Sequence, residues 1–577
     1  MVHAVVDAAP SSEAPVVLKF GSSVLRSKDD LPSVVTELYR HVRAGRKVVA
    51  IVSAFAGETD RLYDEALLFG PGFLSRHAVG LISVGEARAV SLLAVACDRT
   101  GLDAAPLDAR QLGLRARGPF DNAEPVGHAP EAVLEALKSH DIVVAPGYVA
   151  IDDDGAPVLL GRGGSDLSAM MVASALGSDS ATLFKNIPGV FEGLGVRAEG
   201  DDADPRVYDQ ISPATAARHG NALVQEKALQ YAVDNNLTVQ ITALGAPSGV
   251  RISNEDGPLQ PVADKRPVRV GVAGLGIVGE GAALRLLADP GHYEIASLLV
   301  HNPNKPRNSA FDASLLTTDP AAFLAAKPDI VIDLMSSGAA GAELMRAALE
   351  QGVSVISANK QAVAEDLPGA RALAKDKGAH LAYGAAVGGG APMVESAASA
   401  GARGAVASID AVLNGTVNFI LSELQKGAAF EVALKAAQDA GFAEADPSAD
   451  LSGDDARAKA AILAYEAYGV GLNKIDFEIE GLDAEKGASL VAAGGAWRQV
   501  TRIRPQTDGR VKVKVAYEQV DDDPFLSRLR GEANAIRIQM ENGQVIAARG
   551  RGAGRVPTVE SVLGDLGAYR RGRGRSA

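Results

Sequence analysis

Continuous apolar runs alternate along the chain with longer stretches of helical periodicity. Residues 16–20, 48–52 and 142–145 read VVLKF, VVAIV and IVVA, which is the length of short strands. Strands buried on both faces lose the alternation of apolar and polar residues, and they occur in parallel sheets covered by helices. A strand at Val268 opens a second series of the same kind. The pattern predicts an α/β fold with mostly parallel sheets in both halves of the chain.

A stretch of different composition separates the two series. Residues 244–266 read LGAPSGVRISNEDGPLQPVADKR and are rich in Gly, Pro, Asn and Asp. Such residues interrupt regular structure, and no apolar period runs through them. We interpret this stretch as the boundary between two folded regions, with the linker at 251–266.

Composition narrows the class of protein. The 577 residues are 47% hydrophobic and 22% charged, which provides enough apolar material for several domain cores. The net charge of −14 argues against a nucleic-acid surface, and the single cysteine, Cys97, excludes an internal disulfide. No apolar run reaches the roughly 18 residues of a membrane span, and the N-terminus lacks a secretory signal. We therefore expect a cytoplasmic protein with no membrane or nucleic-acid partner.

A glycine motif follows the strand at 268–273 and precedes a helical stretch. It consists of Gly274, Leu275, Gly276, Ile277, Val278 and Gly279. Strand, glycine turn and helix in this order are the context of a dinucleotide site. Gly274 allows the tight turn, Gly276 lets the backbone approach a pyrophosphate, and Gly279 lets helix and strand pack closely. The helix N-terminus then offers its N–H groups to phosphates. A turn that binds no nucleotide is the alternative.

The next strand, 295–300, should end beside the adenosine ribose. Sites that prefer NAD usually carry an acid there. This chain reads HNPNKPR at 301–307, with His301, Lys305 and Arg307 and no acid. Because a 2′-phosphate favours basic partners, we predict NADP, with NAD as a second possibility. Solvated loop charges are the alternative reading.

Residues 441–469 combine a carboxylate-rich loop with a helix. The loop carries Glu444 and Asp450, and Asp455 and Lys459 share one helical face because they are four residues apart. Carboxylates can bind the ammonium group of an amino-acid substrate, and a lysine can donate a proton to a forming alkoxide. An exposed ion pair is the alternative that spacing alone favours.

This segment resembles the signature of the homoserine dehydrogenase family. The pattern E-A-D-P, D, G, D-A, K is complete as Glu444, Asp446, Pro447, Asp450, Gly453, Asp455, Ala456 and Lys459. Further family-like pieces occur before and after this segment in the expected order, at 357–360 (SANK), 387–392 (VGGGAP), 414–418 (NGTVN), 550–554 (GRGAG) and 557–558 (PT). The resemblance covers about residues 267 to 570.

The resemblance implies reduction of aspartate β-semialdehyde to homoserine by hydride from a nicotinamide. Lys459 and Lys360 would stabilise or protonate the developing oxygen, and Asp450 would support the lysines. Glu444 and Asp455 would hold the substrate ammonium.

The closing segment of the family pattern places Gly552 beside the cofactor. Members of the family often bind a monovalent cation through backbone oxygens near the glycine-rich turn, which points here to Val387 and Gly389. Gly384 stands where the family has a glutamate. No His or Cys cluster indicates a catalytic metal.

The first strand of the chain leads into a polar glycine turn. Lys19 can reach ATP phosphates, and N–H groups of a turn with Gly21 and Ser22 can cradle them. Positioning and charge neutralisation are the main needs of phosphoryl transfer. The pattern GxxxxGK[ST] is absent, so this turn is not a P-loop.

Four stretches together resemble aspartokinase, of the amino-acid kinase fold. They are residues 19–21 (KFG), 53–60 (SAFAGETD), 83–86 (SVGE) and 161–166 (GRGGSD), within about residues 16 to 245. The resemblance implies that Arg162 and Glu86 face aspartate with Thr59 nearby. It also implies that Lys19 and Asp166 serve transfer from ATP, which acts with Mg.

The ATP side departs from the family pattern. The glycine turn is one residue short, and T-D-V-x-G-V-Y reads KNIPGVF at 185–191, so we expect Lys185 and Asn186 to contact the nucleotide. The G-A-K-x-L-H-P segment has no good copy, and its lysine is missing unless Lys185 or Lys227 substitutes. An active kinase and a non-catalytic kinase-like domain both stay open. A nucleotide sensor without catalysis is the third reading, against which the Glu444, Asp455 and Lys459 set argues.

These inferences define a domain plan. We expect a disordered tail at 1–14, a kinase domain at 15–250, the linker at 251–266 and a Rossmann domain at 267–390. An α+β catalytic and dimerisation domain follows at 391–545, then a segment returning to the nucleotide domain at 546–570 and a basic tail at 571–577. No regulatory domain fits between the halves, so we expect no threonine or lysine feedback site of the usual kind. A homodimer or homotetramer is expected.

Overall fold

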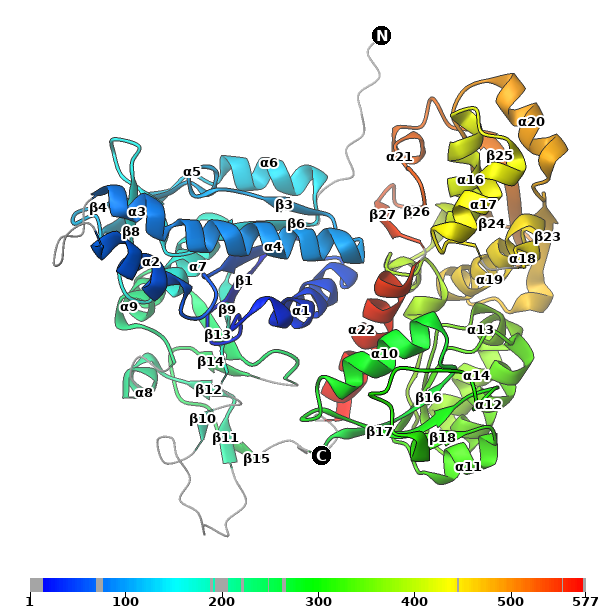
Figure 1. The fold of residues 1–577 in the computed structure, drawn as a ribbon, viewed down its shortest axis with the longest axis horizontal. Helices are drawn as coiled ribbons and strands as arrows, with labels where there is room; N and C mark the ends of the chain where they lie inside the picture. Colours follow the sequence, from blue (N-terminus) through cyan, green and yellow to red (C-terminus); the bar gives the residue numbers. More distant parts are fainter. Residues whose placement is uncertain are drawn as a thin grey trace. The chain divides into compact units, whose positions relative to one another are not determined.

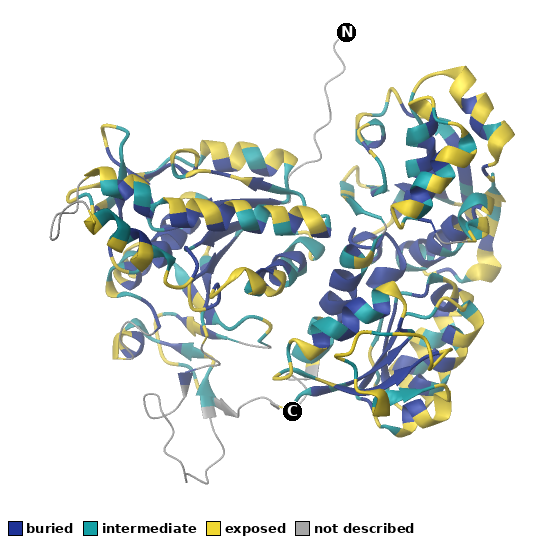
Figure 2. Cartoon of the chain, viewed as in Figure 1, coloured by how far each residue is buried: buried dark blue, intermediate teal, exposed yellow. Residues whose placement is uncertain are grey.

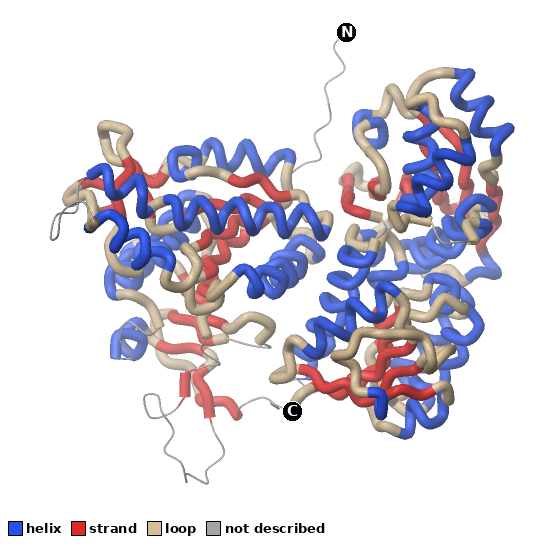
Figure 3. Tube along the Cα trace, viewed as in Figure 1, coloured by secondary structure: helices blue, strands red, loops and turns tan. Residues whose placement is uncertain are grey.

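The computed structural model describes residues 14–68, 76–186, 190–191, 206–218, 223–246, 249–261, 266–443, 446–552 and 554–573. The chain forms two compact units, one built on Pro10–Lys265 and one on Arg266–Tyr569 (Figure 1). Both units are layered α/β structures, so the predicted fold class is confirmed (Figure 3).

The N-terminal unit is built on an eight-stranded sheet of order β12-β14-β13-β9-β1-β2-β6-β3. All its neighbouring strands are parallel except β13 and β14. Its strands are β1 (Val16–Phe20), β2 (Val48–Val52), β3 (Ala104–Pro106), β6 (Ile142–Pro146), β9 (Ser180–Phe184), β12 (Gln210–Ile211), β13 (Thr238–Thr242) and β14 (Val250–Ile252). Smaller sheets contain β4 (Leu114–Arg117), β5 (Glu124–His128), β7 (Val149–Ile151), β8 (Pro157–Leu159), β10 (Val190–Phe191), β11 (Arg206–Tyr208) and β15 (Leu259–Pro261).

Helices cover both faces of this sheet, which explains the apolar runs in its central strands. The helices of the unit are α1 (Leu31–Arg43), α2 (Glu58–Leu67), α3 (Arg76–Ile82), α4 (Val84–Thr100), α5 (Ala109–Leu112), α6 (Glu131–Ser139), α7 (Gly164–Ala175), α8 (Pro213–Arg218) and α9 (Glu226–Asp234). Alternate residues of β1 enter different cores: Leu18 packs with α1 and α4, whereas Val17 belongs to the core that includes α7. Buried residues make up most of the sheet between these helices (Figure 2). The predicted strands at 16–20, 48–52 and 142–145 are therefore present.

Part of the predicted linker is ordered as strands. Within 251–266, β14 pairs with β13 and β15 pairs with β11, so both strands complete sheets of the N-terminal unit. Backbone pairing provides order where the sequence has no apolar period, and Pro261 at the end of an edge strand needs no N–H for the ladder.

One helical stretch of the described residues, Arg76–Thr100, is long and apolar enough to cross a membrane by length and composition. It comprises α3 and α4, and Ala89, Leu93 and Cys97 of α4 are buried in the core around β1, β2 and β6. Core helices meet the same criterion, so the stretch is weak evidence for a membrane span.

The C-terminal unit begins with a six-stranded parallel sheet of order β18-β17-β16-β19-β20-β21. Its strands are β16 (Val268–Ala273), β17 (Tyr293–Leu299), β18 (Leu316–Thr317), β19 (Ile330–Asp333), β20 (Ser354–Ser357) and β21 (Leu381–Ala382). Its helices are α10 (Ile277–Leu287), α11 (Pro320–Ala325), α12 (Gly338–Glu350), α13 (Lys360–Glu365) and α14 (Leu367–Asp376). The last helix, α22 (Arg555–Arg573), packs Val562 and Leu566 into the core of this sheet. Residues 571–573 of the predicted basic tail are thus part of a helix.

A second six-stranded sheet follows, of order β23-β25-β24-β22-β26-β27 and antiparallel except for β23 and β25. Its strands are β22 (Val406–Val412), β23 (Ile475–Ile479), β24 (Trp497–Pro505), β25 (Val511–Gln519), β26 (Ala533–Met540) and β27 (Val545–Arg551). The helices are α15 (Met393–Arg403), α16 (Gly415–Gln425), α17 (Phe430–Asp439), α18 (Ser448–Ser452), α19 (Asp454–Tyr468), α20 (Ala484–Ala493) and α21 (Pro524–Ser527). Helices α15 and α19 share a core with one face of the sheet.

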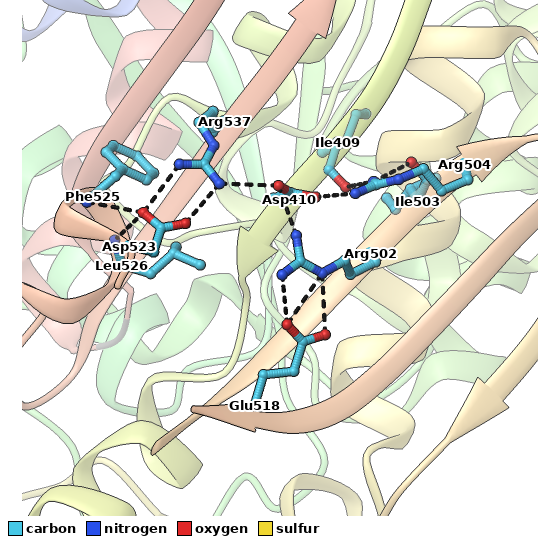
Figure 4. Close-up of polar contacts among 10 residues, drawn as sticks. All are labelled: Ile409, Asp410, Arg502, Ile503, Arg504, Glu518, Asp523, Phe525, Leu526 and Arg537. Carbon is cyan, nitrogen blue, oxygen red and sulfur yellow. Dashed lines mark hydrogen bonds and ion pairs between the residues drawn. The ribbon is translucent and has the colours of Figure 1, made fainter. Parts of the chain in front are cut away.

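The other face of this sheet carries a network of charges (Figure 4). Asp410 of β22 contacts Arg502 at 2.8 Å, Arg537 at 3.1 Å and also Arg504. Burial would raise the pKa of Asp410, but the three guanidinium groups outweigh it and lower that pKa. Arg502 and Arg537 are each shared with a further carboxylate, Glu518 and Asp523 respectively. The network has as many carboxylates as guanidinium groups, so it stabilises this face without excess charge.

Candidate functional site

The glycine motif at 274–279 has the geometry of a phosphate-binding turn. Gly274 has φ +92°, and a Cβ there would lie 2.6 Å from the carbonyl oxygen of Leu334. A Cβ on Gly279 would lie 1.8 Å from the carbonyl oxygen of Gly274, whereas one on Gly276 would meet nothing within 4 Å. The space at Gly276, at the uncapped N-terminus of α10, fits a pyrophosphate. Ile277 is 72% exposed at this helix start, and Val278 packs beside the core.

The loop after β17 contains the predicted basic residues in different roles. Arg307 donates to the carbonyl oxygens of Asn302 at 2.6 Å, Lys305 at 2.9 Å and Pro303 at 3.1 Å. Arg307 therefore stabilises the conformation of this loop. The sequence predicted either a partner for a 2′-phosphate or a solvated charge, and not this structural role. His301 and Lys305 are exposed.

The carboxylate of Asp455 lies between two lysines. Lys360 Nζ is 2.8 Å from one oxygen and Lys459 Nζ is 2.7 Å from the other. Lys360 is the first residue of α13, beyond the strand β20 of the parallel sheet, whereas Asp455 and Lys459 lie on α19. The contact therefore joins the two halves of the C-terminal unit at one carboxylate, and it replaces the exposed ion pair that spacing alone allowed.

Asn414 and backbone groups fix this arrangement. Asn414 Nδ2 donates to Asp450 at 2.9 Å and to Asp455 at 3.0 Å. Lys459 Nζ also donates to the carbonyl oxygen of Leu413 at 2.8 Å. Two acceptors thus use two of the three N–H groups of Lys459 and direct the third.

The pKa values of Asp455 and Asp450 are shifted in opposite directions. Burial would raise the pKa of Asp455, but the ammonium groups of Lys459 and Lys360 outweigh burial and lower it to about 2. Burial, together with the neighbouring charge of Asp455, raises the pKa of Asp450. Asp455 is thus held as an anion that keeps both lysines in place.

Sequence reasoning missed Asp333. This fully buried residue ends β19, accepts from the Ser357 hydroxyl at 2.9 Å and from the N–H of Met335 at 3.0 Å. Ser357 also accepts from the N–H of Asn359, which caps α13 in front of Lys360. The sequence held one signal for this residue, because Asp333 is an acidic residue directly at the end of an apolar strand.

The glycine-rich turn packs against the returning strand β27. A Cβ on Gly389, at φ +58°, would lie 3.0 Å from the carbonyl oxygen of Gly552. Gly552 in turn fits against Asn534, where a Cβ would lie 2.1 Å from Cγ. Gly389 is therefore required by a close approach of backbone, and Gly552 by the close approach of the Asn534 side chain.

The predicted monovalent cation lacks part of its ligand set. Gly384 provides no carboxylate, and its N–H donates to Asp565 of α22 at 3.2 Å. Backbone oxygens of Val387 and Gly389 remain, so the residues present do not reproduce the family's ligands. No group of three or more His, Cys, Asp or Glu side chains that could hold a metal occurs in the described part of the chain. Glu444, predicted to bind the substrate ammonium, lies outside the described residues.

In the N-terminal unit, Lys19 and Asp166 meet as an ion pair of 2.6 Å. Lys185 Nζ lies 2.8 Å from the other oxygen of Asp166, which is 2% exposed at the start of α7. Gly21 covers Lys19 so closely that a Cβ would lie 2.5 Å from Nζ. Ser22 and Asn186 directly follow Gly21 and Lys185 in the sequence, and both are exposed.

On the predicted aspartate side, Glu86 contacts another of the four aspartokinase-like motifs. Glu86 at the start of α4 accepts from the N–H of Ala54 at 3.4 Å, which joins two of the motifs. Its other oxygen is buried and has no hydrogen-bond partner among the described residues. Burial raises the pKa of Glu86 to about 7. Thr59 lies half-buried on α2, and Arg162 is exposed.

Tyr148 is a second residue that the sequence did not reveal. It has φ +69°, an uncommon conformation for a residue with a side chain. Its hydroxyl lies 3.0 Å from that of Tyr63, and Gly164 of the GRGGSD motif fits against its ring. Its contact with Gly164 places Tyr148 beside the GRGGSD motif, one of the four aspartokinase-like stretches.

Three family models match the chain. Residues 14–243 match the amino acid kinase family, residues 274–384 match the homoserine dehydrogenase NAD-binding domain, and residues 392–566 match homoserine dehydrogenase. Homoserine dehydrogenases of Neisseria gonorrhoeae and Pseudomonas aeruginosa are 30% and 32% identical, and each match covers 52% of this chain and 72% of the relative. The crystal structure of a homoserine dehydrogenase from Thiobacillus denitrificans matches with 30% identity and a TM-score of 0.48, over 54% of this chain and 74% of that one.

The order of these domains is that of a bifunctional aspartokinase and homoserine dehydrogenase. The NAD(P)-binding domain, the catalytic domain and the identity to curated enzymes agree on the C-terminal unit. The chain belongs to the homoserine dehydrogenase family and carries an amino acid kinase domain ahead of the dehydrogenase.

Proposed function

We propose that this homoserine dehydrogenase uses the Lys360, Asp455 and Lys459 cluster as its reaction centre and prefers NADP. The observation that carries the proposal is the pair of contacts from Asp455 to lysines of two different domains, 2.8 and 2.7 Å long. A bound nicotinamide would exchange hydride with the carbonyl carbon of aspartate semialdehyde. The chain has to bind the substrate and control the charge on its oxygen.

Lys459 is the group we assign to that oxygen. Its side chain is 11% exposed, and Asp455 and Leu413 hold its ammonium group in a fixed direction. An ammonium donor at the carbonyl oxygen stabilises charge as the alkoxide forms and then supplies the proton. Lys360, with a 37% exposed side chain, adds a second cation from the nucleotide-binding side. Asp455 and Glu444 are assigned to the substrate ammonium.

The preference for NADP rests on the loop at 301–307. Arg307 shapes the loop through backbone carbonyls, and His301 and Lys305 are exposed on it with no acid nearby in sequence. Homoserine-dependent reduction of NADP and NAD by the purified chain, compared as kcat/KM, tests both activity and preference. A higher kcat/KM with NAD would contradict the preference, and no reduction of either would contradict the reaction.

We also propose that the N-terminal unit phosphorylates aspartate with MgATP. Glu86 supports this because one of its buried oxygens has no partner among the described residues, as a site for a substrate ammonium would. Arg162 is assigned to a substrate carboxylate, and Lys19 and Asp166 to the phosphates. ADP release that requires aspartate is the test. Its absence would favour a homoserine dehydrogenase with a non-catalytic kinase-like domain.

We further propose that the enzyme acts in the cytoplasm as a homodimer or homotetramer. The single buried cysteine, Cys97, is compatible with a reducing compartment. Light scattering of the purified chain gives its mass directly, and a monomer would contradict the assembly.

A further inference from the structure

The N-terminal unit has few lysines that could serve phosphoryl transfer. Residues 1–250 contain six, namely Lys19, Lys28, Lys47, Lys138, Lys185 and Lys227. Lys28 is exposed, Lys47 pairs with Asp141, and Lys138 pairs with Glu135. Lys227 contacts the carbonyl oxygen of Ala123 at 2.8 Å and Glu124 at 2.9 Å. Of these six lysines, all of which the structure describes, only Lys19 and Lys185 contact Asp166.

These two lysines converge from neighbouring strands. Lys19 lies in β1 and Lys185 directly follows β9, and the two strands pair in parallel with Phe20 opposite Phe184. Their side chains are 8% and 13% exposed, and each ammonium group contacts a different oxygen of Asp166. The N–H of Lys185 is bonded to the carbonyl oxygen of Thr242 in β13, so its position is fixed by the sheet.

Two buried cations around one carboxylate leave an excess positive charge. Burial lowers the pKa of Lys19, and repulsion by Lys185 acts in the same direction. An anion bound beside the pair would compensate this charge. Asp166 lies in the first turn of α7, and the N-terminal end of a helix also favours an anion.

We propose that Lys185 is a catalytic residue of the kinase reaction, which contacts the γ-phosphoryl group of ATP opposite Lys19. The proposal rests on the proposed function of this unit. The aspartate carboxylate forms a bond to the γ-phosphorus while the bond from phosphorus to the β–γ bridging oxygen breaks. ADP leaves with that electron pair, and no proton is transferred. Lys185 neutralises charge on the transferring group, and Asp166 holds both lysines until the phosphates arrive.

The test compares Lys185→Met with the control Lys227→Met. We expect Lys185→Met to lose at least about 100-fold in kcat for aspartate-dependent ADP release. We expect Lys227→Met to keep the wild-type rate. By calorimetry, Lys185→Met should lose affinity for a non-hydrolysable ATP analogue with Mg and keep the wild-type affinity for ADP, which lacks the γ-phosphoryl group.

The outcomes separate this proposal from the kinase function. An unchanged kcat in Lys185→Met, or an equal loss of affinity for ADP and the ATP analogue, overturns the role of Lys185. If the wild type binds both nucleotides but releases no ADP, the kinase function fails, and the affinity difference still decides whether Lys185 contacts the γ-phosphoryl group. A wild type that binds neither nucleotide overturns both.

Discussion

Asp333 and Ser357 end two adjacent parallel strands, and the Ser357 hydroxyl donates to the buried Asp333 carboxylate at 2.9 Å. Ser357 also accepts from the N–H of Asn359, so Asp333 supports the turn that delivers Lys360 to Asp455. The interaction connects the core of the nucleotide-binding sheet to the proposed reaction centre.

Asp333 should make stability depend on pH in a predictable direction. Burial raises its pKa to about 6, above the ordinary 3.8, so the folded state binds this proton more tightly. The resulting stability is fully present below about pH 4 and is lost as pH rises through 6, at most about 3 kcal/mol. Asp333→Asn removes the titration, so its melting temperature should rise relative to wild type between pH 4.5 and 7.5.

The control for this experiment is Asp319→Asn. Asp319 is an exposed helix cap, and asparagine caps a helix about as well as aspartate. Its melting temperature should therefore stay close to that of wild type. Parallel melting curves for Asp333→Asn and wild type at all pH values would refute the assignment.

Lys459→Ala should remove most dehydrogenase activity. Loss of a proton donor that also stabilises the developing charge should reduce kcat by about 100-fold or more. Lys426→Ala is a matched control because Lys426 is exposed and pairs only locally with Glu423 in the described structure. Steady-state oxidation of homoserine measures both variants. A full rate in Lys459→Ala would show that the proposed mechanism is wrong at its centre.

The pH dependence of aspartate binding should follow Glu86. Its pKa of about 7 means that the carboxylate needed by a substrate ammonium is protonated below neutrality. The KM for aspartate should therefore rise about tenfold per pH unit as pH falls below 7. Glu86→Gln should raise KM at every pH and abolish this dependence, while the dehydrogenase reaction serves as the internal control. A KM for aspartate that stays constant from pH 6 to 8 would exclude Glu86 from binding the ammonium.

Two glycines of the nucleotide turn should respond differently to a methyl group. Gly279→Ala places a Cβ 1.8 Å from the Gly274 carbonyl oxygen and should destabilise the unit by about 1–3 kcal/mol. Gly276→Ala meets no protein atom within 4 Å, so its melting temperature without nucleotide should stay near that of wild type. It should nevertheless weaken NADP binding because the methyl group occupies the space for the pyrophosphate. Equal effects of both variants on melting would contradict this division of roles.

Threonine and lysine should leave both activities unchanged. The segment between the units is short, and it contributes the strands β14 (Val250–Ile252) and β15 (Leu259–Pro261) to the kinase-like unit. Initial rates measured with each amino acid added test the expectation. Strong inhibition by threonine would require a sensing site that the sequence did not reveal.

The sequence alone determined the features that depend on local pattern. Apolar runs identified the central strands because strands buried on both faces need no polar side. The glycines at 274, 276 and 279 were assigned from the order of strand, turn and helix, and the structure gives each a distinct environment. Asp455 and Lys459 share a helical face simply because they are four residues apart.

Only the tertiary structure decided which distant groups meet. Lys360 reaches Asp455 from another domain. Lys185 rather than Lys227 reaches Asp166, because the pairing of β1 with β9 brings Lys185 close to Lys19. The same holds for the strands within the predicted linker, which gain their order from partners far away in sequence. Contacts between distant residues leave no periodic signal in a single sequence, since their energy comes from burial and pairing that exist only once the chain has folded.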